Sequence, residues 1–174
     1  MCGIFGSFST ESIDFEVLKR VGMNSLERGQ DSSGLIYQSD KLNVRKASFS
    51  LKKLFDSEVI GDSYLIAGHS RLATNSISDN QPVVKDGVVL IHNGIVCNYK
   101  ELYSRFNLKQ HYEIDSEIIV DVYNLYLMEG KSSSEACAET LRICEGVVSA
   151  VIFDTNNNKI IFLSNNGSFY YSQA

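Results

Sequence analysis

The first half of the chain alternates short apolar runs with polar turns. An apolar run at residues 4–8 predicts a strand close to the N-terminus, and a polar turn follows it. In residues 14–26 the apolar positions recur with the helical period, and Asp14 is placed to cap such a helix. Two strands that form a hairpin are predicted at residues 35–38 and 42–48. A short helix is predicted at residues 49–55 and a buried strand at residues 64–69.

The second half places helices between strands. A strand is predicted at residues 88–91, ending at the turn-forming sequence His92-Asn93-Gly94, and the longest candidate loop, residues 75–87, precedes it. Helices are then predicted at residues 99–106, 116–128 and 134–143, and strands at 147–153, 159–163 and 168–172. Because strands lie at both ends and helices in blocks between them, the pattern favours a layered α+β fold over an alternating parallel sheet.

Composition and charge narrow the classes of function. The chain has 174 residues, 44% of them hydrophobic, which favours one compact globular domain. With 16 basic and 21 acidic residues the net charge is -5, so we expect neither nucleic acid nor a membrane surface as a partner. The N-terminus lacks the basic region of a signal peptide, and no apolar run is long enough to span a bilayer. These features predict a cytoplasmic protein that acts on a small molecule.

The cysteines and histidines do not have the spacing of metal ligands. No CxxC pair occurs among the four cysteines, and the three histidines are scattered. We therefore expect no metal and no other cofactor. Beyond Cys2, the cysteines Cys97, Cys137 and Cys144 are expected to be small core residues. His69 and His92 are expected to form structural hydrogen bonds.

Cys2 is the most unusual residue of the chain. Initiator methionine is normally removed before small residues, so the mature chain would begin with Cys2 and carry a thiol and a free α-amine on one residue. An α-amine has a pKa of about 7.7 to 8.0, so at neutral pH part of it is an unprotonated base beside its own nucleophile. The alternative is a small buried residue at the start of a strand.

Three further segments carry residue types suited to binding or catalysis. Arg71 and Thr74 follow a buried strand and can face a ligand, although Arg71 could instead form a surface salt bridge. Asn93 and Gly94 offer a side-chain amide and an unobstructed backbone N–H, the pair needed to hold an oxyanion, although Asn-Gly is also a common hairpin turn. Asp115 lies at the start of the most amphipathic helix, where it could equally be an N-cap.

Together with MCGIFG at residues 1–6 and RGQDSSG at residues 28–34, these segments resemble the class II glutamine amidotransferase domain in order and spacing. Members of this family are N-terminal nucleophile hydrolases. The resemblance runs from residue 1 to about residue 165. It implies a four-layer αββα sandwich and a single glutaminase domain over residues 1–174, with no room for the synthase domain that family members usually carry.

The resemblance also implies a reaction. Cys2 would attack the side-chain amide of L-glutamine, with its own α-amine as the general base. The attack would form a γ-glutamyl thioester and release ammonia, and water would then free glutamate. Asn93, through its side-chain amide, and Gly94, through its backbone N–H, would form the oxyanion hole. The ammonia would pass to a synthase subunit or domain.

The same resemblance assigns residues that would bind glutamine. Arg71, supported by Thr74, would hold the α-carboxylate, and Asp115 would pair with the α-ammonium group. This arrangement is physically reasonable, because a zwitterionic amino acid needs one fixed cation and one fixed anion. The loop at residues 75–87 is a candidate lid over the bound substrate.

Some positions differ from the usual family pattern. Arg28 and Asp31 are expected to brace the site rather than touch substrate. Leu72 stands where the aminosugar-forming branch usually has tryptophan, and Asn75 stands where that branch usually has histidine. Residues 28–34, by contrast, are closer to the phosphoribosylamine-forming branch, so the sequence combines features of both branches. Tyr170 and Tyr171 are expected to lie in an edge strand packed on the core, with docking to a partner as the alternative.

Two other functions stay open at this point. The chain could be a non-catalytic, glutamine-binding regulatory module, which would require that Met1 is retained and acylates the amine of Cys2. It could also be an N-terminal nucleophile hydrolase that acts on another amide, such as a peptide. The pairing of Arg71 with Asp115 argues for a free amino acid as substrate.

Overall fold

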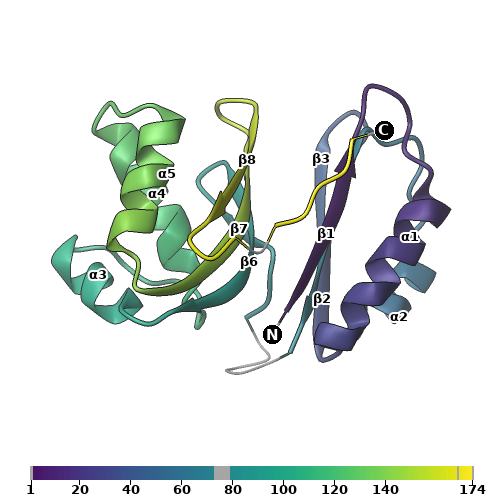
Figure 1. The fold of residues 1–174 in the computed structure, drawn as a ribbon, viewed down its shortest axis with the longest axis horizontal. Coiled ribbons are helices and arrows are strands. Elements are labelled where there is room, and N and C mark those ends of the chain that lie inside the picture. Colours follow the sequence, from purple (N-terminus) through teal and green to yellow (C-terminus); the bar gives the residue numbers. More distant parts are fainter. Residues whose placement is uncertain (1, 73–78, 168, 174) are drawn as a thin grey trace. The chain divides into compact units, whose positions relative to one another are not determined.

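The computed structural model describes residues 2–72, 79–167 and 169–173, and the chain divides into two compact units, Met1–Pro82 and Val83–Ala174 (Figure 1). Each unit contains one antiparallel sheet, and the helices of that unit lie along one face of the sheet. Each unit therefore supplies one α layer and one β layer. The predicted α+β composition is thus present in both halves of the chain.

The first unit is built on the sheet order β1-β4-β2-β3. Its strands are β1 (Gly3–Phe8), β2 (Ser32–Gln38), β3 (Leu42–Ala47) and β4 (Leu65–Arg71), and its helices are α1 (Phe15–Asn24), the 3₁₀ helix η1 (Ser25–Arg28) and α2 (Leu51–Ser57). Asp14 caps α1 as predicted, because its Oδ1 accepts hydrogen bonds from the backbone N–H groups of Glu16 and Val17. Apolar side chains from the two helices and the sheet, including Leu18, Leu51 and Phe55, form the core.

The second unit has the sheet order β5-β6-β7-β8. Its strands are β5 (Val83–Lys85), β6 (Val88–Val96), β7 (Gly146–Asp154) and β8 (Lys159–Ser164), and its helices are α3 (Tyr99–Arg105), α4 (Glu117–Met128) and α5 (Ser133–Ile143). Helix α4 is the centre of this unit: its residues Ile118, Ile119, Val122 and Tyr123 are all fully buried. Residues 117–123 are buried without interruption, so α4 is apolar on nearly all sides and less one-sided than α1. The expectation that this is the most amphipathic helix is therefore wrong.

The structure corrects several expectations about the elements. The predicted loop at residues 75–87 contains strand β5, and residues 80–83 are buried. Residues 169–172 form no strand, and Tyr170 is 96% exposed, so the predicted packing of a last strand on the core is wrong. Cys137 and Cys144 are buried as predicted, whereas Cys97 is exposed because it follows the end of β6.

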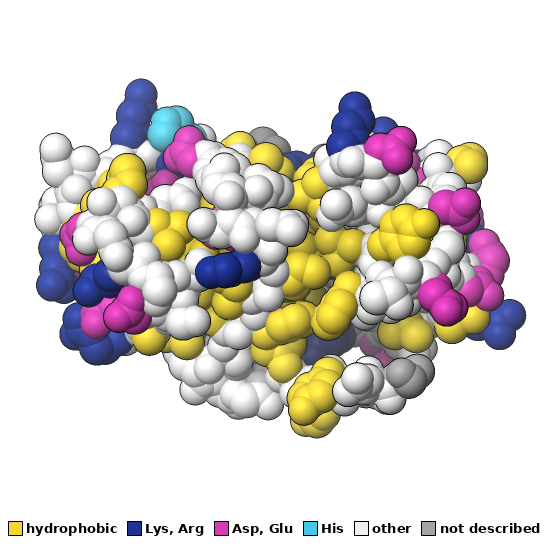
Figure 2. Space-filling model, turned by 90° about the horizontal axis from the view of Figure 1, so that it is seen from above, with side chains coloured by type: hydrophobic (Ala, Val, Ile, Leu, Met, Phe, Trp, Pro, Cys, Tyr) yellow, Lys and Arg dark blue, Asp and Glu magenta, His cyan; other side chains and the backbone are white. Residues whose placement is uncertain are grey.

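The surface carries both signs of charge. On the face visible in Figure 2, basic and acidic side chains are interspersed with apolar ones. Among the described residues, no helix is both long and apolar enough to cross a membrane.

Candidate active site

The register of β1 against β4 determines where Cys2 lies. Gly3 pairs with Ser70, so the next positions outward along the two strands are Cys2 and Arg71. A side chain on Gly3 would lie only 2.6 Å from Ser25 Cβ and 2.7 Å from Ser70 Oγ, and therefore only glycine fits there. Cys2 itself is half-buried rather than enclosed in the core. The strand register thus brings Cys2 and Arg71 to the same end of two neighbouring strands.

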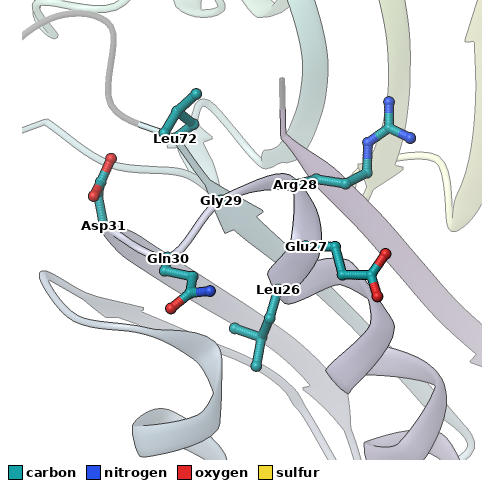
Figure 3. Close-up of a pocket in the computed structure, with 7 residues that line it drawn as sticks. All are labelled: Leu26, Glu27, Arg28, Gly29, Gln30, Asp31 and Leu72. Carbon is teal, nitrogen blue, oxygen red and sulfur yellow. The ribbon is translucent and has the colours of Figure 1, made fainter.

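The loop that follows η1 lies against the end of β4 (Figure 3). The backbone N–H of Asp31 donates to the carbonyl oxygen of Arg71 at 3.0 Å. Gly29 lies so close to the backbone of Arg71 and Leu72 that a Cβ there would overlap it. Asp31 therefore braces the strand end through its backbone, while its side chain is exposed.

A depression of about 590 Å³ lies over this loop. Its lining residues in the described part of the chain are Leu26, Glu27, Arg28, Gly29, Gln30, Asp31 and Leu72. In Figure 3 the side chains of Arg28 and Glu27 extend to one side of Gly29, and that of Asp31 extends to the other. The charged groups of this loop thus line a solvent-accessible surface of the first unit.

Arg71 is buried, with only 5% of its surface exposed. Its guanidinium group donates from Nη1 to the carbonyl oxygen of Asp79 at 2.6 Å. The alternative of a surface salt bridge is therefore wrong. Thr74 lies outside the described residues.

The segment after Arg71 returns to the sheet at Asn80. The side-chain amide of Asn80 donates to the carbonyl oxygens of Ser33 and Ala47, at 3.0 and 2.9 Å, and its Oδ1 accepts from the hydroxyl of Ser32 at 3.0 Å. Asn80 is 6% exposed, so these bonds satisfy a buried amide. Within the predicted lid at residues 75–87, Asn80 is therefore fixed to β2 and β3, and residues 75–78 lie outside the described residues.

Asn93 and Gly94 lie within β6, where they pair with Ser149 and Val148 of β7. Both the prediction that the strand ends before them and the alternative that they form a hairpin turn are therefore wrong. Gly94 has a φ of 150°, and a Cβ on it would overlap the carbonyl oxygen of Val147. Only glycine therefore fits at this position, and the chain can pass close to β7.

Asp115 lies one residue before the N-cap of α4. Its Oδ2 accepts a hydrogen bond of 2.6 Å from the backbone N–H of Val96, the last residue of β6. The N-cap is Ser116, so the alternative that Asp115 caps the helix is wrong. Among the described residues, no hydrogen bond to its other oxygen, Oδ1, is found. The half-buried carboxylate is thus fixed beside the end of β6, the strand that carries Asn93 and Gly94.

His92 has the structural role that the sequence predicted. It is 1% exposed, its Nδ1 lies 2.9 Å from the hydroxyl of Ser116, and its Nε2 lies 3.2 Å from the carbonyl oxygen of Val147. Burial lowers the pKa of the imidazole, and this effect outweighs the opposing influence of Asp115 and of the bond to Val147. The ring is therefore neutral at neutral pH.

Sequence reasoning missed a buried charge cluster at the start of α4. Lys85 Nζ lies 2.6 Å from Glu117 Oε1 and 2.6 Å from Asp121 Oδ1, and Tyr103 donates its hydroxyl to Asp121 at 3.1 Å. The available signal was the spacing of Glu117 and Asp121, which places two carboxylates on one face of an otherwise apolar helix.

The two carboxylates of this cluster respond differently to burial. Burial alone would raise the pKa of Glu117, but hydrogen bonds from Lys85 and from the backbone N–H groups of Tyr112 and His111 outweigh it and lower that pKa. Burial raises the pKa of Asp121 despite its bond to Lys85. The described residues contain no group of three or more histidine, cysteine or acidic side chains placed to hold a metal ion.

Comparison with solved structures identifies the fold. The glutamine phosphoribosylpyrophosphate amidotransferase of B. subtilis, in complex with ADP and GMP, superposes with a TM-score of 0.72 at 20% identity, over 94% of this chain and 37% of that one. A structure described as the allosteric regulatory enzyme of purine biosynthesis superposes with a TM-score of 0.68 at 20% identity, over 87% of this chain and 35% of that one. The fold is therefore the predicted N-terminal nucleophile hydrolase fold of class II amidotransferases.

Sequence comparison then gives the family. A family profile described as a glutamine amidotransferase domain matches residues 69–173, and the chain belongs to this family. The glutamine–fructose-6-phosphate aminotransferases (isomerizing) of Staphylococcus epidermidis strain RP62A and of Bacillus subtilis strain 168 are each 28% identical to it over 180 residues. Both alignments cover 97% of this chain, and they cover 30% and 29% of the relatives. The chain thus spans about three-tenths of the length of these curated relatives.

Proposed function

We propose that this chain hydrolyses the side-chain amide of L-glutamine to glutamate and ammonia. The observation that carries the proposal is the register of β1 against β4, which places Cys2 and Arg71 at the same end of adjacent strands in a member of the glutamine amidotransferase family. A nucleophile beside a buried cation suits a substrate that carries a carboxylate.

The proposed chemistry begins at Cys2 after removal of Met1. The free α-amine of Cys2 accepts the thiol proton, and Sγ attacks the amide carbon of glutamine. The resulting tetrahedral intermediate collapses when the amine returns the proton to the leaving nitrogen, which departs as ammonia. Water, deprotonated by the same amine, then cleaves the thioester and releases glutamate. No histidine is needed as a base.

Asn93 and Gly94 are the proposed oxyanion hole. The side-chain amide of Asn93 and the backbone N–H of Gly94 would each donate to the carbonyl oxygen as it becomes negative. The position of Gly94 is closely constrained by β7, so its N–H does not need to reorganise during the reaction. Each such donor typically contributes about 100- to 1,000-fold in rate.

Arg71 and Asp115 are the proposed contacts to the amino-acid end of glutamine. Burial of Arg71 strengthens its attraction for a carboxylate, and its bond to Asp79 fixes the direction of the guanidinium group. The Oδ1 oxygen of Asp115 would accept from the α-ammonium group, while Oδ2 keeps its hydrogen bond from Val96. Thr74 is proposed as a further contact to the carboxylate.

The proposed product ammonia would be used by a synthase subunit or domain. A cytoplasmic location and the absence of nucleic acid, membrane, metal and cofactor from the reaction are part of this proposal. Its support is the family membership.

The test is the variant Cys2→Ala, with Cys97→Ala as a matched control that removes an exposed thiol elsewhere. Glutamate release from glutamine is expected to disappear in Cys2→Ala and to persist in Cys97→Ala, while calorimetry shows glutamine binding by both variants. Glutamate release by Cys2→Ala at the wild-type rate would exclude Cys2 as the nucleophile.

Two further measurements separate the alternatives. Intact-mass spectrometry of protein from its native host is expected to show that Met1 is absent, whereas retained methionine would favour a non-catalytic glutamine-binding module. Glutamine with a blocked α-amine is expected not to react, because Asp115 would lose its ammonium partner. Turnover of the blocked compound would favour a hydrolase acting on another amide.

A further inference from the structure

The hydrogen bonds of His92, in the second unit, determine which of its ring nitrogens carries the proton. The carbonyl oxygen of Val147 can only accept, so His92 Nε2, at 3.2 Å, carries the proton and donates it. Nδ1 of the neutral ring is then an acceptor, and the hydroxyl of Ser116 donates to it at 2.9 Å. The ring is therefore a fixed bridge from β7 to the start of α4.

Ser116 uses its side chain differently from an ordinary N-cap serine. It occupies the N-cap position of α4, yet its hydroxyl makes no capping bond. Ser132, at the N-cap of α5, provides the contrast, because its hydroxyl accepts from the backbone N–H of Glu135 in a capping box. The hydroxyl of Ser116 therefore forms a hydrogen bond with His92 instead of capping the helix.

Each end of this bridge lies next to a residue with a proposed role in the reaction, Gly94 at one end and Asp115 at the other. The carbonyl oxygen of Val147, held by His92, is the atom against which Gly94 is packed most closely. At the other end, Ser116 directly follows Asp115, whose carboxylate bonds to the backbone of Val96 on β6. One buried ring thus connects the oxyanion segment to the carboxylate.

We propose that His92 and Ser116 are positioning residues for glutamine hydrolysis, an inference that rests on the proposed function. His92 holds Val147 so that the N–H of Gly94 points in a fixed direction. Ser116 holds the start of α4 so that Asp115 presents one oxygen to the α-ammonium group. Neither side chain touches the reacting atoms.

The variants His92→Phe, His92→Gln and Ser116→Ala test this assignment in the full chain. His92→Phe is expected to lower kcat for glutamate release by about 10- to 100-fold, which is less than the loss of a whole oxyanion donor. His92→Gln, which keeps an N–H donor for Val147, is expected to recover most of this kcat. Ser116→Ala is expected to raise KM for glutamine by about 3- to 10-fold with kcat nearly unchanged.

Ser132→Ala is the matched control. It removes an N-cap hydroxyl that does cap its helix, so it is expected to lower thermal stability without changing KM or kcat. Calorimetry of glutamine binding by Ser116→Ala is expected to show the same 3- to 10-fold weakening, and it requires no turnover.

These outcomes separate the positioning role from the proposed function. If the wild-type chain releases no glutamate, the proposed function fails, and the calorimetric comparison still decides the role of Ser116. If the wild type is active but His92→Phe keeps full kcat, or Ser116→Ala binds glutamine as the wild type does, the positioning role is overturned. Equal losses in Ser116→Ala and Ser132→Ala would also overturn it, because they would reflect stability alone.

Discussion

Replacing Lys85 by methionine would remove the ammonium group that bridges two buried carboxylates of α4. Lys85 Nζ lies 2.6 Å from both Glu117 and Asp121, and the side chain of Glu117 is completely buried. Methionine keeps most of the aliphatic length of lysine but carries no charge. The substitution therefore tests the electrostatic contribution with little change in packing.

The expected cost follows from what each carboxylate retains. Without Lys85, Glu117 keeps the backbone N–H groups of His111 and Tyr112, while Asp121 keeps the hydroxyl of Tyr103. Breaking a buried ion pair by removing one partner typically costs about 3–5 kcal/mol, because the remaining charge is uncompensated. We expect a loss of this size in the free energy of unfolding at pH 7.

The penalty should also depend on pH. The pKa of Asp121 is already raised by burial, and loss of Lys85 would raise it further. A carboxyl group with a raised pKa in the folded state binds a proton before the unfolded chain does, so its folded form gains stability as pH falls. The penalty of Lys85→Met is therefore expected to be smaller at pH 5 than at pH 7.

Urea unfolding at pH 7 and pH 5 measures both effects. The control is Lys19→Met, which breaks an ion pair of 3.2 Å with Asp56, a carboxylate that is 58% exposed. This exposed pair should contribute about 0–1 kcal/mol. The double variant Lys85→Met/Asp121→Asn should recover part of the stability at pH 7. A cost no greater than that of Lys19→Met, or a penalty that does not shrink at pH 5, would refute the reasoning.

Two further predictions concern the segment His92-Asn93-Gly94. Gly94→Ala is expected to lower kcat for glutamate release by about 100-fold, because a Cβ would force β6 away from Val147 and misdirect an oxyanion donor. Gly130→Ala, at a φ of 85° with open space around it, should leave kcat unchanged, so equal kcat for the two variants would contradict the assignment of Gly94. For His92, the lowered pKa of the buried ring predicts that wild-type stability falls as pH drops below about 6.5, by up to about 1.4 kcal/mol per pH unit. His92→Gln should lack this component in urea unfolding between pH 7.5 and 5, and an identical pH slope would show that the ring is not kept neutral by the fold.

Local chemistry in the sequence was sufficient for the cap of α1 and for most elements. Asp14 caps its helix because the capping bonds join residues only two and three positions apart. The high density of apolar residues located α4, because that helix is buried on nearly all sides. The order and spacing of several short motifs identified the family, since each motif is local and their combination is specific.

Other features depended on contacts between residues far apart in sequence. Asn93-Gly94 has the composition of a turn, yet it lies inside β6 because pairing with β7, some 55 residues later, extends the strand through it. Tyr170 follows a strand-like pattern but lies outside every strand of the described residues, and its side chain is exposed. Propensity is a weak signal wherever a distant partner decides whether a backbone segment is paired.

For the candidate site, the sequence by itself determined which residue types were present: a cysteine next to the first residue, an arginine at a strand end, and an aspartate before the long helix. Only the tertiary structure decided that Arg71 is buried and bonded to Asp79, that Asp115 binds the backbone of β6 instead of capping α4, and that Lys85 neutralises two buried carboxylates. The physical reason is that burial and hydrogen-bond partners are set by strand register and packing. These bring together groups whose separation along the chain gives no local signal.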